Sequence, residues 1–174
     1  MAFEATNEQL LLDSLASTMA TQVPLAIDAI NSILVAGGKP SLADPATYTA
    51  VPSGTTYEVR EDLENVPLER GPHVAIFVEG DCDNDDWMSQ HVDIIIPLAI
   101  VLTSHQADTP TTTDFQSRYY CRALETGLRK SYKTAGAWHC GDVMTSIEKT
   151  GNDRNRRHSI VRATLRLRTT RGST

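Results

Sequence analysis

The segment from residue 159 to 171 constrains the fold more than any other part of the chain. From Val161 to Arg168 apolar residues alternate with basic or polar ones, and successive side chains of a β-strand point to opposite faces of a sheet. The apolar side holds Val161, Ala163, Leu165 and Leu167, and the other side holds Arg162, Arg166 and Arg168. Burying three unpaired guanidinium groups would be very costly, so this second face must meet water, anions or an acidic partner. We therefore expect a sheet that is covered on one face only.

The remaining segments supply helices and further strands for such a sheet. Two helical segments are expected near the N-terminus, over 7–22 with Asn7 as N-cap and from Pro24 to the stop at Gly37. A long central helix is expected over 114–133, opened by a capping box that runs from Thr113 to Gln116. Strands are expected at 55–60, 73–79, 88–104 and 137–148, in addition to 159–171. Pro97 cannot donate a ladder hydrogen bond, which predicts an edge, a bulge or a bend within the long strand 88–104.

This order of elements predicts the α+β class, with a mostly antiparallel β-sheet and helices packed on one face. The 174 residues fit one domain, 1–174, with loops at 39–54 and 81–90, and the first loop is the one expected to be mobile. No uninterrupted apolar run reaches about 18 residues, and the N-terminus lacks the pattern of a signal peptide. We therefore expect a protein that is made in a cytosol and has no membrane partner.

Charge is divided very unevenly along the chain. Residues 1–110 carry 3 basic and 17 acidic side chains, a net charge of −14, whereas residues 111–174 carry 13 basic and 5 acidic side chains, a net charge of +8. Asymmetry of this size points to an interaction surface. Two interpretations remain open: the two parts neutralise each other within one subunit, or they meet between neighbouring copies.

Motifs for catalysis, metals or cofactors do not assemble in this sequence. The run from Asp81 to Asp86 places acidic residues at positions 1, 3 and 5 of an EF-hand-like loop, but Asp86 and Val92 stand where that loop needs Gly and Glu. The five histidines form no ligand pair, the three cysteines form no CxxC motif and are expected to be reduced, and no nucleophile elbow or phosphate loop is present. We expect no enzyme activity and no cofactor, although members of a catalytic triad can lie far apart in sequence. A small cytosolic enzyme or a ligand-binding regulator is therefore kept as the alternative from another class.

The one candidate for binding a polyanion is the basic stretch 154–157 together with the arginine face of the last strand. Lys and Arg gain affinity for phosphates through counterion release, without reading sequence. The net charge of −6 and the lack of aromatic residues within this stretch argue against a dedicated nucleic-acid binder. The alternatives are a solvated sheet face and salt bridges to an acidic region of another copy.

The order and hydrophobic pattern of the elements resemble a known family. The pattern runs from the N-terminal helix through Val74–Val78, the long strand around His91–Ile96, the capped helix Asp114–Lys133 and the closing strand Ile160–Thr169. In this arrangement the chain, from about Asn7 to Arg171, resembles the tail terminators of tailed bacteriophages (minor tail protein U-like). The resemblance implies a structural virion protein of the tail and neck, assembled in the host cytoplasm. Its subunits would form a hexameric ring that caps the tail tube and joins it to the head connector, with DNA passing non-specifically through the lumen. A head-completion or connector protein of the same particle looks similar at this level and is the first alternative.

No catalytic residue comes with this resemblance, but the charge pattern predicts which side chains meet in such a ring. Head-to-tail ring contacts need two different, complementary patches. We expect part of the acidic segment 58–93 to meet the basic segment 118–168 of the next subunit. The inter-subunit acidic candidates are Glu58, Glu61, Asp62, Asp83, Asp85 and Asp86. The candidates for a basic surface between subunits, or for a surface that faces the lumen and DNA, are Arg154, Arg156, Arg157, Arg162, Arg166 and Arg168.

Overall fold

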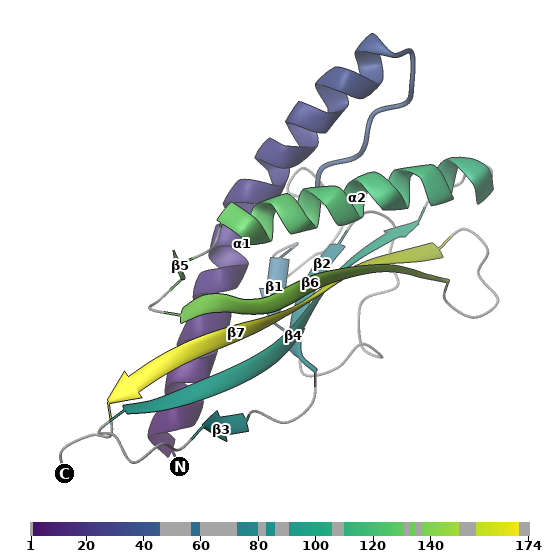
Figure 1. Cartoon of the computed structure of the whole chain (residues 1–174). Coiled ribbons are helices and arrows are strands. Elements are labelled where there is room, and N and C mark those ends of the chain that lie inside the picture. Colours follow the sequence, from purple (N-terminus) through teal and green to yellow (C-terminus); the bar gives the residue numbers. More distant parts are fainter. Residues whose placement is uncertain are drawn as a thin grey trace.

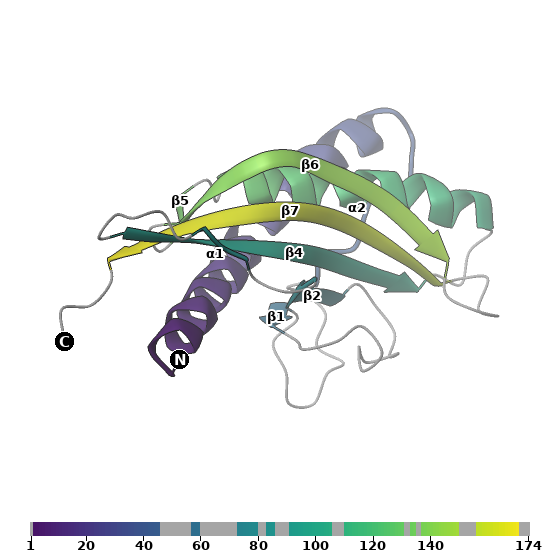
Figure 2. The same cartoon turned by 60° about the horizontal axis from the view of Figure 1, so that its bottom comes forward.

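The computed structural model has a β-sheet in one layer and two helices in the other (Figure 1). It describes residues 2–45, 57–59, 73–79, 83–85, 91–105, 110–130, 133–134, 137–149 and 156–170. Helix α1 (Ala2–Ala36) and helix α2 (Pro110–Lys130) both lie behind the sheet in Figure 2, on the same face of it. The α+β class is therefore confirmed, with an N-terminal helix, a central helix and one helix-covered face.

The sheet is mostly antiparallel, as predicted. Its strand order is β1-β2-β4-β7-β6-β5, and β3 also pairs with β4. The bounds are β1 Tyr57–Val59, β2 His73–Val78, β3 Asp83–Asp85, β4 His91–His105, β5 Lys133–Thr134, β6 Ala137–Lys149 and β7 Arg156–Thr170. Strand β1 runs parallel to β2, and the other pairings are antiparallel.

The centre of the sheet is the antiparallel pair β4–β7, which is in register from His91↔Thr170 to His105↔Arg156. Alternation along both strands divides their side chains between the two faces. The helix-facing side of the pair is buried in the main core and holds Ile96, Leu98, Ile100, Leu102, Val161, Ala163 and Leu165. The opposite face carries a small second cluster of Ala99, Val101 and Ile160. The predicted one-sided sheet is therefore present, with an additional small apolar patch on its outer face.

Pro97 lies in the middle of β4, opposite Thr164 of β7, so the predicted edge position is wrong. The flank of β4 away from β7 is shared by two short strands: β3 reaches Ile95, and β2 begins to pair at Leu98. Pro97 falls in the gap between them, and its carbonyl accepts a hydrogen bond of 2.9 Å from the N–H of Glu79. In a strand the N–H and C=O of one residue point to the same side, so the missing N–H of Pro97 faces this gap. A central strand can therefore hold a proline without losing a bond to β7.

Helix α1 is one continuous helix, and the predicted division at Pro24 is wrong. A proline inside a helix removes one backbone hydrogen bond and costs about 3 kcal/mol. Burial of one stripe offsets that cost, because Leu15, Met19, Val23 and Ile27 recur every four residues and are fully buried. The helix also begins at Ala2, so Asn7 lies within it and is not its N-cap.

By length and composition, the stretch Leu11–Ala36 of α1 could cross a membrane, a feature that the search for uninterrupted apolar runs missed. In this stretch 28% of the most apolar window is buried, and Leu11, Leu15 and Ile27 belong to the main core.

Helix α2 begins at Pro110, three residues before the predicted capping box. Thr113 therefore lies inside the helix and cannot act as its N-cap. The side-chain Oε1 of Gln116 is buried and makes no hydrogen bond among the described residues, so the reciprocal bond of a capping box is not formed. Pro110 suits the first turn, where an N–H would have no partner within the helix.

The two helices approach each other closely at Gly127. A β-carbon at this position would lie 2.8 Å from Cγ2 of Val23 and 3.4 Å from Sδ of Met19. Any residue larger than glycine would therefore push α2 away from α1. Helix α2 is also tied to the sheet, because the hydroxyl of Ser159 on β7 donates to the carbonyl of Ser117 at 3.0 Å in a buried position.

Residues 39–45, the first part of the loop expected to be mobile, are pinned to both helices. The side-chain amide of Asn31 donates to the carbonyl of Leu42 at 3.0 Å and accepts from its N–H at 2.7 Å. The hydroxyl of Tyr120 accepts from the N–H of Ala43 and donates to its carbonyl, both at 3.0 Å. Leu42 is itself buried in the core. These contacts hold residues 39–45 against the helices, whereas residues 46–54 lie outside the described part of the chain, and the mobility of the loop stays a prediction.

Candidate interaction surfaces

The outer face of the sheet is held together by Arg162. Its Nε donates to both carboxylate oxygens of Glu79, at 3.0 and 2.8 Å, and its Nη1 donates to the hydroxyl of Ser146 at 2.9 Å. Its Nη2 lies 3.4 Å from Oε1 of Glu148. The hydrogen bond to Glu79 raises the pKa of Arg162, and Glu148 adds to the effect. Arg162 was predicted to face another subunit or a lumen, but its guanidinium is engaged within its own subunit. For this residue the internal-neutralisation interpretation is the correct one.

Arg157 is a second correction. It lies on the helix-facing side of β7, is only 2% exposed and is engaged with other groups of the subunit. A side chain at this depth cannot face a lumen or a neighbouring subunit. The same alternation that puts Arg162 and Arg166 on the outer face puts position 157 on the helix-facing side. In the prediction, Arg157 was grouped with the basic stretch 154–157, and the alternation was not applied to it.

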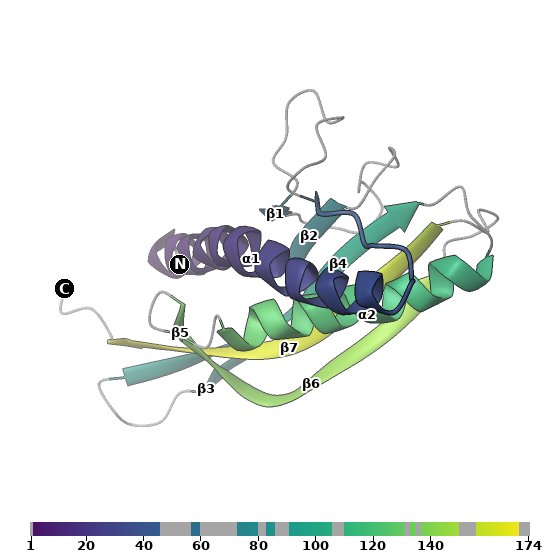
Figure 3. The same cartoon turned by 90° about the horizontal axis from the view of Figure 1, so that it is seen from above.

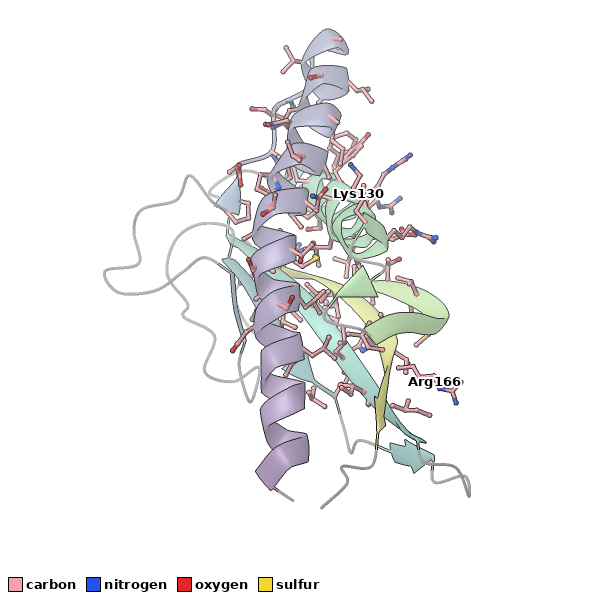
Figure 4. The ribbon with its side chains drawn as sticks, turned by 90° about the vertical axis from the view of Figure 1, so that its left-hand side faces the viewer. Lys130 and Arg166 are labelled. Carbon is pink, nitrogen blue, oxygen red and sulfur yellow. The ribbon has the colours of Figure 1, made fainter. Side chains whose placement is uncertain are left out.

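Arg166 lies on the outer face as predicted. It is opposite Ile95 of β4 and Trp138 of β6 in the strand register. Figure 4 shows it projecting from the sheet on the side away from α1. Arg166 and Arg157 lie on opposite faces because their positions along the strand differ by an odd number.

Of the other predicted inter-subunit residues, some have only a position in a strand, and the rest lie outside the described residues. Asp83 and Asp85 of β3 stand opposite Ile95 and Asp93 of β4, which stand opposite Arg166 and Arg168 of β7. These register rows bring acidic and basic positions to the same region of one subunit. Arg156 is at the start of β7, and Glu58 is on β1 at one edge of the sheet. The other four candidates, Glu61, Asp62, Asp86 and Arg154, lie outside the described residues.

Strand geometry also bears on the calcium alternative. Asp83–Asp85 form the short strand β3, which pairs with β4. Such an extended segment does not wrap an ion as an EF-hand loop does. In the described part of the chain no group of three or more His, Cys, Asp or Glu residues could hold a metal ion.

A basic ridge runs along the exposed side of α2. It consists of Arg118, Arg122, Arg129 and Lys130, all exposed, and Arg129 forms an ion pair of 2.8 Å with Glu125 one turn earlier. The two basic residues at the end of the helix are favourably placed for its dipole. The ridge lies between two grooves, one toward β6 and one toward α1.

The groove toward β6 is polar and has a volume of about 390 Å³. Arg118, Arg122 and Arg129 of α2 line it together with Thr145 of β6. Cys121 lies at its base as a free, buried thiol whose Sγ is 3.5 Å from the carbonyl of Ser146. Burial raises the pKa of this thiol, which makes it a weak nucleophile.

The groove toward α1 is mainly apolar and has a volume of about 420 Å³. From α1 it is lined by Leu25, Ile30 and Ile33, and from α2 by Tyr119, Arg122 and Lys130. Figure 4 shows Lys130 at the end of α2 that lies beside α1. Leu25 and Ile33 are 54% and 74% exposed, and Val35 on the same helix is 63% exposed. Figure 1 shows why: the C-terminal part of α1 extends past α2 and beyond the sheet.

The two edges of the sheet differ. Strand β5 covers only the first two residues of β6, so from His139 to Lys149 no described strand pairs with the outer flank of β6. This flank curves along the free side of the sheet in Figures 2 and 3. It exposes Met144 (62%) and Ile147, and the basic ridge of α2 lies next to it. The opposite edge ends in the three-residue strand β1, which carries Glu58.

Three of these features escaped the sequence analysis. The exposure of Leu25 and Ile33 depends on how far α1 extends past the sheet, which the apolar pattern within the helix does not reveal. The open flank of β6 depends on which strands pair, and periodicity within one strand does not reveal that. The pairing of Glu79 with Arg162 joins residues 83 positions apart through the strand order. The sequence signal for the exposed helix end is the length of the apolar stretch in α1, which exceeds what one sheet face can cover.

No protein-family model matches the chain. No curated protein matches it either.

Proposed function

We propose that the protein is a structural subunit that assembles head to tail into a closed ring, in the manner of the tail terminators that its sequence resembles. In this role it would cap the tube of a phage tail and join it to the head connector, with DNA passing through the ring. A hexamer is the ring size that the resemblance implies. The protein would act by assembly, and no catalytic step is part of the proposal.

The observation that carries this proposal is the difference between the two edges of the sheet. An exposed edge strand is a template for another chain, and natural proteins usually cover or charge it. Strand β6 carries only three charged residues, Asp142, Glu148 and Lys149. Between the first two of them it exposes the apolar side chains of Met144 and Ile147. Contacts between two unlike patches propagate in one direction and close into a ring when the rotation allows.

Charge supports the same direction of assembly. The basic ridge of α2 lies beside the β6 edge, and Glu58 lies on the opposite edge. In the proposed contact between an acidic and a basic segment of neighbouring subunits, the basic ridge of α2 therefore takes the role first assigned to Arg157 and Arg162. Complementary charges at such a contact would steer association and set its direction.

Electron microscopy and sedimentation velocity of the purified protein test this proposal. We expect rings at low salt and their dissociation into smaller species as salt rises. Charged residues on an edge strand block strand addition, so Thr145→Lys with Ile147→Lys should abolish the rings. Ser17→Lys, at an exposed position on α1, is the matched control and should leave them intact. Absence of rings from the wild-type protein under all salt conditions and with purified tails would refute the proposal.

A further inference from the structure

The groove between α1 and α2 has the character of a helix-binding site. Side chains of two crossing helices form its walls, with Leu25 and Ile33 on α1 and Arg122 and Lys130 on α2 (Figure 1). Grooves of this kind receive the apolar face of an amphipathic helix, whose anchors recur every three or four residues. The rise of about 1.5 Å per residue separates Arg122 from Lys130 by about 12 Å along α2, or roughly two turns of an occupying helix. The occupant must therefore be a helix with an apolar stripe and acidic residues at its side.

Helix α1 itself meets this description. It contains four acidic residues, Glu4, Glu8, Asp13 and Asp28, and no Lys or Arg. Its C-terminal half exposes Leu25, Ile33 and Val35, and Asp28 is the only charged residue between 17 and 36. Asp28 is exposed, and helical geometry puts it on the side of the Leu25–Ile33 stripe opposite to Ile30. Within the described part of the chain, neither Asp28 nor Arg122 nor Lys130 takes part in an ion pair.

We infer that the groove binds α1 of a second copy of this chain. Leu25 and Ile33 of α1 form one wall of the groove in their own subunit. In the pair, the same two side chains insert into the groove of the other copy. The contact is thus made by like surfaces about a two-fold axis. With the two α1 helices parallel, Asp28 of each copy lies against Arg122 and Lys130 of the other, and Leu25 and Ile33 of both copies are removed from water.

Concavity and charge favour this occupant over a lipid surface. A helix that binds a membrane lies on it with a convex apolar face flanked by Lys and Arg. Here the apolar side chains line a groove, and the exposed apolar helix is acidic. The carboxylate of Asp28, beside the exposed apolar stripe, would be repelled by anionic lipids and attracted by the basic residues of α2.

The inference is independent of the proposed ring. A two-fold contact joins subunits in pairs, whereas the β6 edge joins them in one direction. The Thr145→Lys, Ile147→Lys protein should therefore still form pairs while it forms no rings. A parent protein that forms rings but no pairs would refute the inference alone, and one that forms pairs but no rings would leave it standing and refute only the ring.

A charge-exchange experiment on the full chain, in that ring-deficient background, tests the contact by sedimentation equilibrium. Arg122→Glu and Asp28→Arg should each weaken pairing about tenfold or more, because both copies of the ion pair become repulsive. An equimolar mixture of the two variants should pair again, because each mixed contact then opposes a carboxylate to a guanidinium. Arg118→Glu, an exposed arginine of α2 that does not line this groove, is the matched control and should pair like the parent.

Three outcomes would overturn the inference. The first is a parent protein that stays monomeric at every concentration. The second is a mixture of Arg122→Glu and Asp28→Arg that remains unpaired although both variants unfold cooperatively in urea. The third concerns flotation with vesicles of phosphatidylcholine and phosphatidylglycerol. If the parent floats with them, Ile33→Lys does not, and the state of association of the parent is unchanged, the groove binds a lipid surface.

Discussion

Arg162 on β7 holds the carboxylate of Glu79 across the width of β4, with Nε at 3.0 and 2.8 Å from its two oxygens. Because β4 separates β7 from β2, this pair connects strands that share no backbone hydrogen bond. It also lies over the small outer cluster at Ala99, which stands opposite Arg162 in the register. The pair therefore fixes the outer face of the sheet within one subunit.

Glu79→Gln should lower the free energy of unfolding by about 0.5–1 kcal/mol, because the pair is partly exposed to solvent. Urea unfolding at low salt and in about 1 M sodium chloride measures the effect, which should shrink at high salt as the charges are screened. Glu125→Gln, which removes the surface pair with Arg129 on α2, is the control and should cost no more than about 0.5 kcal/mol. An equal loss in both variants would mean that the connection across β4 adds nothing.

Gly127→Ala should destabilise the protein by about 1–3 kcal/mol. Alanine favours a helix by about 1 kcal/mol over glycine, but its β-carbon would lie 2.8 Å from Cγ2 of Val23 and force the helices apart. Val23→Ala removes the obstructing methyl groups, so the double variant should lose less stability than the sum of the single variants. Chemical denaturation of all four proteins gives this coupling, and strict additivity would contradict the proposed clash.

Tyr120→Phe should cost about 1–3 kcal/mol at neutral pH, because the N–H and C=O of Ala43 both lose their partner. Proteolysis gives a second readout, since the segment 39–45 should be cut faster once it is held by Asn31 alone. Asn31→Ala in the same assay provides the comparison, and unchanged cleavage in both variants would show that neither contact restrains the segment.

Alkaline pH should reduce the difference between Tyr120→Phe and wild type. Burial raises the pKa of Tyr120 above its ordinary value of 10.0, so the folded state keeps the phenol proton while the unfolded state releases it. A raised pKa contributes stability that is complete below the unfolded value and is lost as pH rises from there toward the folded value. At pH 11 the wild type should have lost about 1.4 kcal/mol that the variant does not lose. Urea unfolding of both proteins at pH 9 and pH 11 measures this change.

Cys121 should resist alkylation in the native protein. It is buried against Ser146 and Ser159, and burial raises the pKa of its thiol, so little thiolate is available at neutral pH. In a Cys82→Ser, Cys140→Ser background, iodoacetamide should label the protein only as fast as it opens or unfolds. Mass spectrometry over a urea series measures the rate, and rapid labelling without urea would contradict the burial.

The strands and the central helix could be predicted from the sequence because their patterns are local. The alternation from Ser159 to Leu165 and the apolar run His73–Val78 indicate strands in any context, and both were confirmed. The division of α1 was wrong because Pro24 is a strong local signal, and only tertiary burial of Val23 and Ile27 outweighs it. Tertiary packing also places Pro97 in a central strand, beside a gap that no local pattern encodes.

The candidate surfaces were less predictable than the fold. The charge asymmetry is real, but its meaning depends on which strands are neighbours, and that is a property of topology. Arg162 and Arg157 were assigned to an exposed basic surface, whereas the strand order gives the first an internal acidic partner and the alternation turns the second inward. The role of α2 could be anticipated in part, because Arg118, Arg122 and Lys130 occur on one predicted helix.

The pairing of β4 with β7 has a consequence for how fast the chain can fold. Its partners are between 51 and 79 positions apart in sequence, and α2 and β6 lie in the intervening chain. Contacts of such long range require the closure of a large loop before they contribute any stability, and chains dominated by them fold in milliseconds to seconds. The hairpin of β6 and β7 can form locally, but the sheet is complete only when β4 pairs with β7. In the proposed ring, association through the flank of β6 would therefore have to wait for this slow step.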